Sequence, residues 1–153
     1  MTTILSPTRG GEKSYPNQDF AIELAKERGA DLLFLYVSDV QFLNHRSSPV
    51  LIDVVAELEE MGEFLLAMAQ ERAGKSGVEA DIVVRSGVFR EVLQELIPKY
   101  DVSTLVLGSS DEETGVTTDE FLVNMSQELS ENHPLEVLIV RDGTILQTIN
   151  PAD

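Results

Sequence analysis

The chain has 153 residues, a formal net charge of −16 at pH 7 and no cysteine. That charge argues against nucleic acid and anionic membranes as partners, because both recruit Lys and Arg to phosphate groups. The lack of cysteine excludes disulfides and thiol catalysis, and no apolar run approaches the roughly 20 residues that a membrane span needs. We therefore expect one cytoplasmic domain without a signal peptide. The acidity is typical of a protein kept in solution by its charge, or of one adapted to high salt.

Short apolar runs alternate with helical periodicities along the whole sequence. Asn17 is a candidate N-cap, Gly29 a helix stop, and Pro49 a first helical residue. In chain order we expect a strand at 2–7, a helix at 17–29, a strand at 31–38, a helix at 48–74, a strand at 78–86, a helix at 88–97, a strand at 104–108, a helix from Thr117 or Thr118 to 133, and a strand at 135–140.

The long helix at 48–74 carries apolar residues at helical spacing, which we interpret as its buried stripe. These residues are Leu51, Val54, Val55, Leu58, Met61, Leu65 and Met68. We interpret Met61, Met68 and Met125 as core side chains and not as part of a cofactor site.

This alternation predicts an α/β domain, a five-stranded parallel sheet with helices on both faces. The common strand order for this count is 3-2-1-4-5, with right-handed crossovers. The third strand alternates apolar and charged residues and should lie near an edge. The domain should span residues 1–142, and residues 143–153 should be a polar tail. Because the order reverses between strands one and four, the loops 8–15 and 108–116 should flank a ligand crevice.

The stretch from Ser103 to Ser110 is a strand that ends abruptly in small residues before the next helix. Strand, small-residue loop and helix are how α/β proteins build an anion site. Here this part of the sequence is rich in acidic residues, whose carboxylates would repel a phosphate. They are Asp111, Glu112, Glu113, Asp119 and Glu120. The run 111–113 could also ligate Mg²⁺ or Ca²⁺, but we interpret it as a solvated charge run and predict no metal site.

Several short segments follow one another in a characteristic order and spacing over nearly the whole chain. They are Ile4-Leu-Ser-Pro-Thr8, Ala21-Ile-Glu-Leu-Ala25 leading to Gly29-Ala-Asp-Leu-Leu33, Tyr36-Val37, Gly87 before a helix, Leu105-Val-Leu-Gly-Ser109, and His133-Pro134 before Val137-Leu-Ile-Val140. Together they resemble the universal stress protein family. The resemblance implies a dimeric, Rossmann-like fold of the adenine nucleotide alpha hydrolase type. In one branch of the family it also implies ATP in the crevice.

The chain keeps part of that branch's ATP-binding pattern and loses the rest. Retained positions are Pro7, Thr8, Val37 and Gly108, with Ser109 beside them. Arg9 replaces the Asp that contacts adenine, and Asp111 replaces the second glycine of the strand-four loop, although Gly115 could substitute in a lengthened loop. Val123-Asn124 replaces the later Gly-Ser pair, where a Cβ would stand in the way of a phosphate. We expect a degenerate crevice formed by Pro7, Thr8, Arg9, Val37, Gly108, Ser109 and Asn124, without ATP or another cofactor.

Arg9 invites two interpretations, as a cation that holds an anionic ligand or as one that neutralises nearby acids. We favour the second and predict an ion pair with Asp111, Glu112 or Glu113. The segment Arg9-Gly-Gly-Glu-Lys-Ser14 also resembles half of the strand-one loop of ATP pyrophosphatases, which leaves an adenylating enzyme as a distant alternative. His45 and His133 have no catalytic partner at suitable spacing.

The last strand predicts the assembly. It holds five apolar residues in six, and an exposed edge of that composition is a template for pairing. We expect a homodimer through strand five, as the resemblance also implies, with an interface at Leu135, Val137, Leu138, Ile139 and Val140. The function that follows is non-enzymatic, a stress-response domain acting through protein association or ligand sensing on an unidentified protein partner. The main alternative is a divergent binder of ATP or AMP.

Overall fold

A computed structural model describes residues 2–38, 49–109 and 119–151. Within these residues, six strands form one sheet in the order β3-β2-β1-β4-β5-β6. The first five are parallel and stand in the predicted order, with β3 at an edge, while β6 is antiparallel to β5. The strands are β1 (Thr3–Pro7), β2 (Asp31–Ser38), β3 (Ala80–Ser86), β4 (Val102–Gly108), β5 (Glu136–Arg141) and β6 (Thr144–Ile149).

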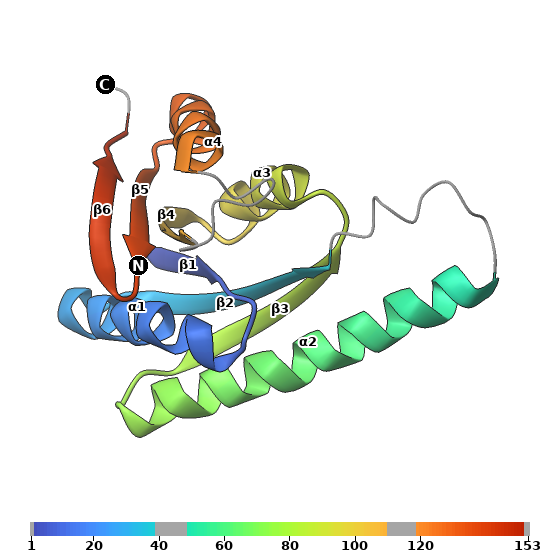
Figure 1. Cartoon of the computed structure of the whole chain (residues 1–153). Coiled ribbons are helices and arrows are strands. Elements are labelled where there is room, and N and C mark those ends of the chain that lie inside the picture. Colours follow the sequence, from blue (N-terminus) through green and yellow to red (C-terminus); the bar gives the residue numbers. More distant parts are fainter. Residues whose placement is uncertain (1, 39–48, 110–118, 152–153) are drawn as a thin grey trace.

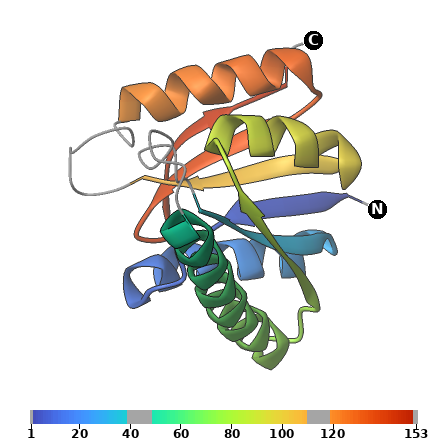
Figure 2. The ribbon, with the colours of Figure 1, turned by 90° about the vertical axis from the view of Figure 1, so that its right-hand side faces the viewer.

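Helices cover both faces of the sheet, as predicted. α1 and α2 lie on one face, and α3 and α4 lie on the other (Figures 1 and 2). Their bounds are α1 (Tyr15–Arg28), α2 (Pro49–Lys75), α3 (Phe89–Lys99) and α4 (Asp119–Asn132), with a short 3₁₀ turn, η1 (Glu12–Ser14), before α1. None of these helices, in the part of the chain that is described, combines the length and apolarity needed to cross a membrane.

Strand β2 shows how the sequence builds this core. Leu33 and Leu35 pack with α3 and α4 residues in one buried cluster, while Leu32 and Phe34 join α1 and α2 residues in the other. Successive side chains of a strand point to opposite faces, so an unbroken apolar run buries both. β2 therefore lies inside the sheet, between β1 and β3.

The C-terminal residues differ from the expected polar tail. Asp142 and Gly143 have φ values of 51° and 80°, and two central residues with positive φ make the tight hairpin turn that Asp-Gly favours. Residues 144–149 therefore return as β6 alongside β5. β5 is not an edge strand, and the side chains expected at a dimer interface are buried within this chain: Leu135, Val137, Leu138, Ile139 and Val140.

The buried stripe of α2 also differs from the expected one where it can be compared, since the side chains expected at 51, 54 and 55 lie outside the described residues. Small and branched residues, Leu66, Ala69 and Ala73, face the core, whereas Met61 and Met68 are exposed. The apolar pattern of this helix has two faces, and the sheet takes the face with small residues because these allow a close approach. The prediction for Met125 is confirmed, since it is buried against the opposite side of the sheet.

Candidate functional site

The carboxyl ends of β1 and β4 lie side by side, because these two strands are direct neighbours. Pro7 ends β1, and the N–H of Thr8 then donates to the carbonyl of Leu35 at 2.8 Å. Gly108 ends β4, and the N–H of Ser109 donates to the carbonyl of Val140 at 2.7 Å. The structure therefore brings the predicted residues Pro7, Thr8, Gly108 and Ser109 to one edge, where the strand order reverses.

The loop after β1 is held by its own side chains. The Thr8 hydroxyl accepts hydrogen bonds from the N–H of Gly10 at 3.1 Å and from Nε2 of Gln18 at 2.9 Å. Gly10 has a φ of +82°, and a Cβ there would lie 2.5 Å from Cβ of Leu65 in α2. Only glycine fits this position, so the loop is packed tightly between β1 and α2.

Asn17 fills the space beside Gly108. A Cβ added to Gly108 would lie 3.0 Å from Nδ2 of Asn17, and Oδ1 of Asn17 accepts a hydrogen bond from the N–H of Gly143 at 2.9 Å. The prediction of Asn17 as an N-cap is wrong, because α1 begins two residues earlier, at Tyr15. The side chain instead connects α1, the end of β4 and the β5–β6 turn.

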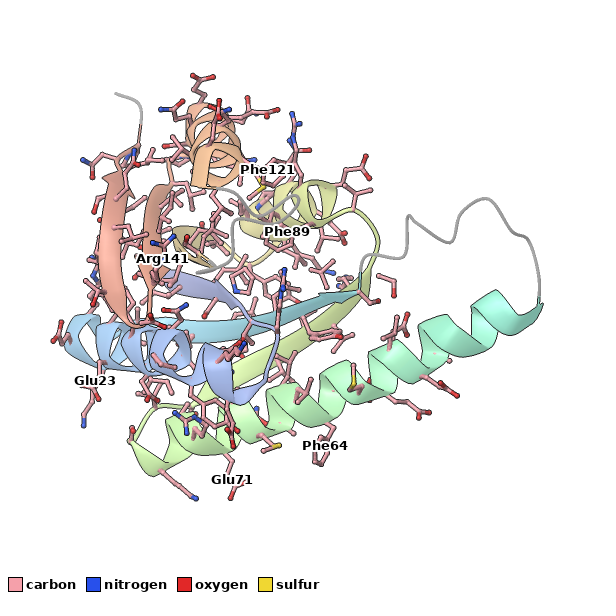
Figure 3. The ribbon with its side chains drawn as sticks, in the orientation of Figure 1. Glu23, Phe64, Glu71, Phe89, Phe121 and Arg141 are labelled. Atoms are coloured by element: carbon pink, nitrogen blue, oxygen red, sulfur yellow. The ribbon has the colours of Figure 1, made fainter. Side chains whose placement is uncertain are left out.

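Arg141 is a functional candidate that the sequence analysis missed. It ends β5 at the same edge of the sheet, and its Nη2 donates to the hydroxyl of Ser109 at 3.0 Å (Figure 3). Its position directly after a buried parallel strand was the available signal, because the carboxyl ends of such strands share one edge. This edge of the sheet, where the crevice was predicted, therefore carries a half-buried cation next to a hydroxyl.

The remaining predicted residues are more dispersed. Arg9 is exposed in the loop after β1, and Asn124 is exposed on α4. Val37 is partly buried near the end of β2, where it packs with α3 and α4 residues in one core cluster. Glu120 is exposed in the first turn of α4. The side chains of the other acids, at 111–113 and 119, lie outside the described residues, so the ion pair expected for Arg9 stays a prediction.

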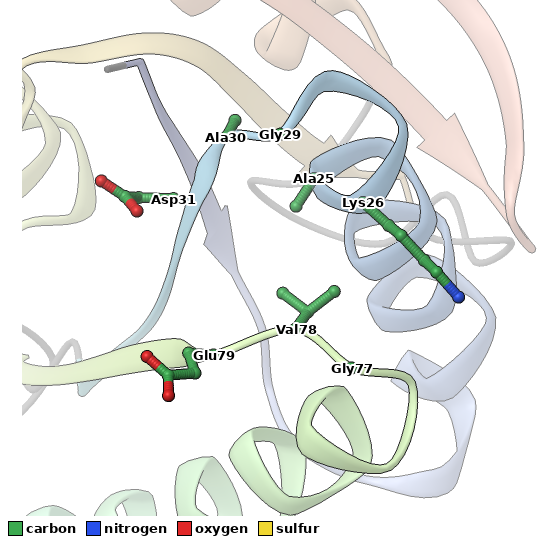
Figure 4. A pocket seen from close by; sticks show the side chains of 8 residues that line it. All are labelled: Ala25, Lys26, Gly29, Ala30, Asp31, Gly77, Val78 and Glu79. Carbon is green, nitrogen blue, oxygen red and sulfur yellow. The ribbon is translucent and has the colours of Figure 1, made fainter.

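A shallow hollow of 240 Å³ lies at the opposite end of the sheet. The ends of α1 and α2 border it, and Asp31 and Glu79 stand at the amino ends of β2 and β3 (Figure 4). Lys26 extends away from both carboxylates (Figure 4). Because ligands of parallel sheets bind at the carboxyl ends of the strands, this hollow is not the predicted crevice. Within the residues described, no three acidic or histidine side chains are grouped so as to hold a metal ion.

The fold and the strand order agree with one known family. The model of the universal stress protein family matches residues 1–141. The chain belongs to this family. The match ends at Arg141, the last residue of β5, so β6 lies beyond the part of the chain that the family model covers. No curated protein matches the chain.

Solved universal stress proteins share this fold at low sequence identity. A protein of the family from Burkholderia pseudomallei is 21% identical, with 91% of this chain and 95% of that chain covered and a TM-score of 0.67. UspA from Lactobacillus plantarum is 18% identical, with coverages of 92% and 97% and a TM-score of 0.70. A universal stress protein in complex with cAMP is 21% identical, with coverages of 92% and 97% and a TM-score of 0.64.

Proposed function

We propose that this universal stress protein acts in the cytoplasmic stress response through association with other proteins or through ligand sensing, without catalysis and without binding ATP. Membership of the family supports the stress-response role. The position of the Asn17 side chain beside Gly108 is the observation that supports the proposed absence of ATP binding. The resemblance places Gly108 in the glycine loop after strand four that the ATP-binding branch uses, and here the side chain of Asn17 lies beside it.

Two hydroxyls at this edge of the sheet also have partners inside the protein. The Thr8 hydroxyl accepts from Gly10 and Gln18, and the Ser109 hydroxyl accepts from Arg141. A nucleotide would have to replace these hydrogen bonds with its own, so the net gain from each new contact is small. The net charge of −16 adds a repulsion that a triphosphate feels more strongly than a neutral ligand does.

Three observations favour the alternative of a divergent adenine-nucleotide binder. Arg141 places a guanidinium at the crevice wall, and a guanidinium is suited to phosphate recognition. Oε1 of Gln18 is buried and has no hydrogen-bond partner among the described residues, and an amino group of a ligand would satisfy such an acceptor. A relative of the same fold is known in complex with cAMP.

Calorimetric titration separates these functions. With Mg-ATP we expect no dissociation constant below about 100 μM, which is roughly −5.5 kcal/mol. Titrations with AMP and cAMP in parallel test the alternative, and loss of any such binding in Arg141→Gln would place the ligand in this crevice. A micromolar constant for Mg-ATP contradicts the proposal. Release of pyrophosphate from ATP, in the presence of carboxylic acid or amine acceptors, would instead support the adenylating enzyme.

We also propose that the protein forms a homodimer. Strand β6 forms the edge of the sheet beside β5. Its sequence, Thr144-Ile-Leu-Gln-Thr-Ile149, has no charge and no proline. Its residues are exposed or only partly buried, and an uncharged edge of this composition offers backbone groups to another strand. Pairing with β6 of a second copy across a two-fold axis satisfies both edges by an antiparallel contact.

A further inference from the structure

The outward side of α2 carries a row of large apolar side chains. Met61, Phe64 and Met68 are 47%, 65% and 37% exposed, and their spacing of three and four residues places them on one side of the helix. Phe64 points away from the sheet (Figure 3). The core-facing side is a different one, formed by Leu66, Ala69 and Ala73. We call Met61, Phe64 and Met68 the apolar stripe.

The helix that carries the stripe is longer than the sheet that supports it. With 27 residues, α2 is about 40 Å long at about 1.5 Å per residue. Strand β2 has eight residues and spans about 27 Å. The first turns of α2 therefore extend beyond the sheet (Figure 1). In the sequence, apolar residues with the same spacing of three and four continue toward this end at Leu51, Val54 and Leu58.

The stripe is flanked by carboxylates. Glu57 precedes Met61 by four residues, Glu60 precedes Phe64 by four, and all are exposed. Residues at these separations are neighbours on a helix surface. Glu71, three residues after Met68, is exposed and points away from the sheet (Figure 3).

Cations on the same helix do not offset the charge of Glu57 and Glu60. Arg72 is bound to Asp19 of α1, and its guanidinium stacks 4.1 Å above the ring of Tyr15. Lys75 lies 3.9 Å from Glu71, about two turns beyond Met68, and offsets only the charge of Glu71. The surface around the stripe therefore combines exposed apolar area with negative charge.

We propose that the apolar stripe is a docking surface for a basic amphipathic helix of a partner protein. This deepens the protein-association role proposed above and rests on it. The apolar face of such a helix would cover Met61, Phe64 and Met68, while its Lys and Arg residues would meet Glu57, Glu60 and Glu71. Methionine suits such a surface, because its flexible, polarisable side chain adapts to differently shaped partners.

Charge disfavours the other candidate occupants. An antiparallel second copy centred on Phe64 would set Glu57 of one copy opposite Glu71 of the other, since both lie seven residues from that centre. Like charges at such a contact suppress pairing. An anionic membrane surface would be repelled in the same way.

A labelled synthetic peptide made of two Leu-Lys-Lys-Leu-Leu-Lys-Leu heptads tests this surface by fluorescence anisotropy. We expect it to bind the intact chain, to bind more weakly when salt is raised from about 50 to about 500 mM, and to lose affinity at least about tenfold in M61S/F64S. The double variant E57Q/E60Q should bind it several-fold more weakly. A peptide with Glu in place of Lys should not bind.

Matched variants test whether peptide binding depends on the apolar stripe or on exposed charge and apolar area elsewhere on the protein. E23Q/E27Q removes two exposed carboxylates from α1, and F121S removes an exposed apolar side chain from α4; both should leave peptide binding unchanged. Circular dichroism checks that each variant is folded. Equal binding by the intact chain and M61S/F64S overturns the inference. So does stripe-dependent self-association in light scattering, or stripe-dependent binding to phosphatidylcholine vesicles. The Mg-ATP titration decides the statement on nucleotide separately, so failure of the peptide alone overturns the docking surface and not the crevice.

Discussion

Asn17 and Gly143, which are 126 residues apart in the sequence, are joined by a hydrogen bond of 2.9 Å from the Gly143 N–H to the Asn17 side chain. The same side chain approaches Gly108. One amide therefore connects the first turn of α1, the end of β4 and the turn between β5 and β6. The crevice and the hairpin that extends the sheet depend on a shared residue.

The first prediction concerns this amide. Asn17→Ala removes the acceptor of a part-buried N–H, so the free energy of unfolding should fall by about 1 kcal/mol. Urea denaturation followed by circular dichroism measures the difference. Asn124→Ala is the matched control, because Asn124 is exposed on α4 and its truncation should change stability by less than about 0.5 kcal/mol. Equal midpoints for the two variants would show that the contact does not contribute.

The second prediction compares two glycines of α2. A Cβ on Gly62 would collide with the ring of Tyr36 in β2, whereas a Cβ on Gly74 would meet nothing within 4 Å. Gly62→Ala should destabilise the protein by about 1 to 3 kcal/mol through overpacking. Gly74→Ala should stabilise it by up to about 1 kcal/mol, because alanine loses less backbone entropy in a helix. Thermal unfolding of both variants provides the measurement, and shifts of the same sign would refute this account of how α2 is seated.

The third prediction concerns assembly. Static light scattering of the unmodified chain at micromolar concentration should give the mass of a dimer. Leu146 is exposed on β6, and Leu146→Lys should yield monomers, since a lysine on an edge strand opposes pairing. Gln127→Lys adds the same charge at an exposed position of α4 and should remain dimeric. A monomeric unmodified chain, or two variants that behave alike, would rule out the β6 contact.

The fourth prediction concerns Arg9, which is exposed. Its expected ion pair with Asp111 should appear in a double-mutant cycle of Arg9→Ala and Asp111→Ala as a coupling below about 1 kcal/mol, because exposed pairs are weak. The coupling should decrease as salt is raised. Cycles with Glu112 and Glu113 identify which acid is the partner, and additivity in all three would mean that Arg9 pairs with none of them.

The sequence by itself determined the central sheet. The apolar run of β2 buries both faces, and the same holds for β5, where Val137 and Ile139 join one core cluster and Leu138 and Val140 the other. Such runs show from the local sequence alone that both faces of the strand are buried, because side chains alternate along a strand. The end of α1 at Gly29, which has a φ of 61°, is also determined by the local sequence. These signals predicted five parallel strands, and the order common to such sheets then predicted where the crevice should lie.

Only the tertiary structure decided which groups fill the crevice and which surfaces stay open. The local sequence predicts Asn17 as a helix N-cap, but its partners come from β4 and from a turn 126 residues away. Residues 143–153 were expected to be a polar tail, yet the hairpin at Asp142 and Gly143 adds β6 and covers the edge of β5. In α2, periodicity marks apolar residues on two sides. Close packing of Gly62 against Tyr36 seats one side on the sheet and leaves Met61, Phe64 and Met68 exposed, because backbone approach depends on the partner surface as much as on the helix itself.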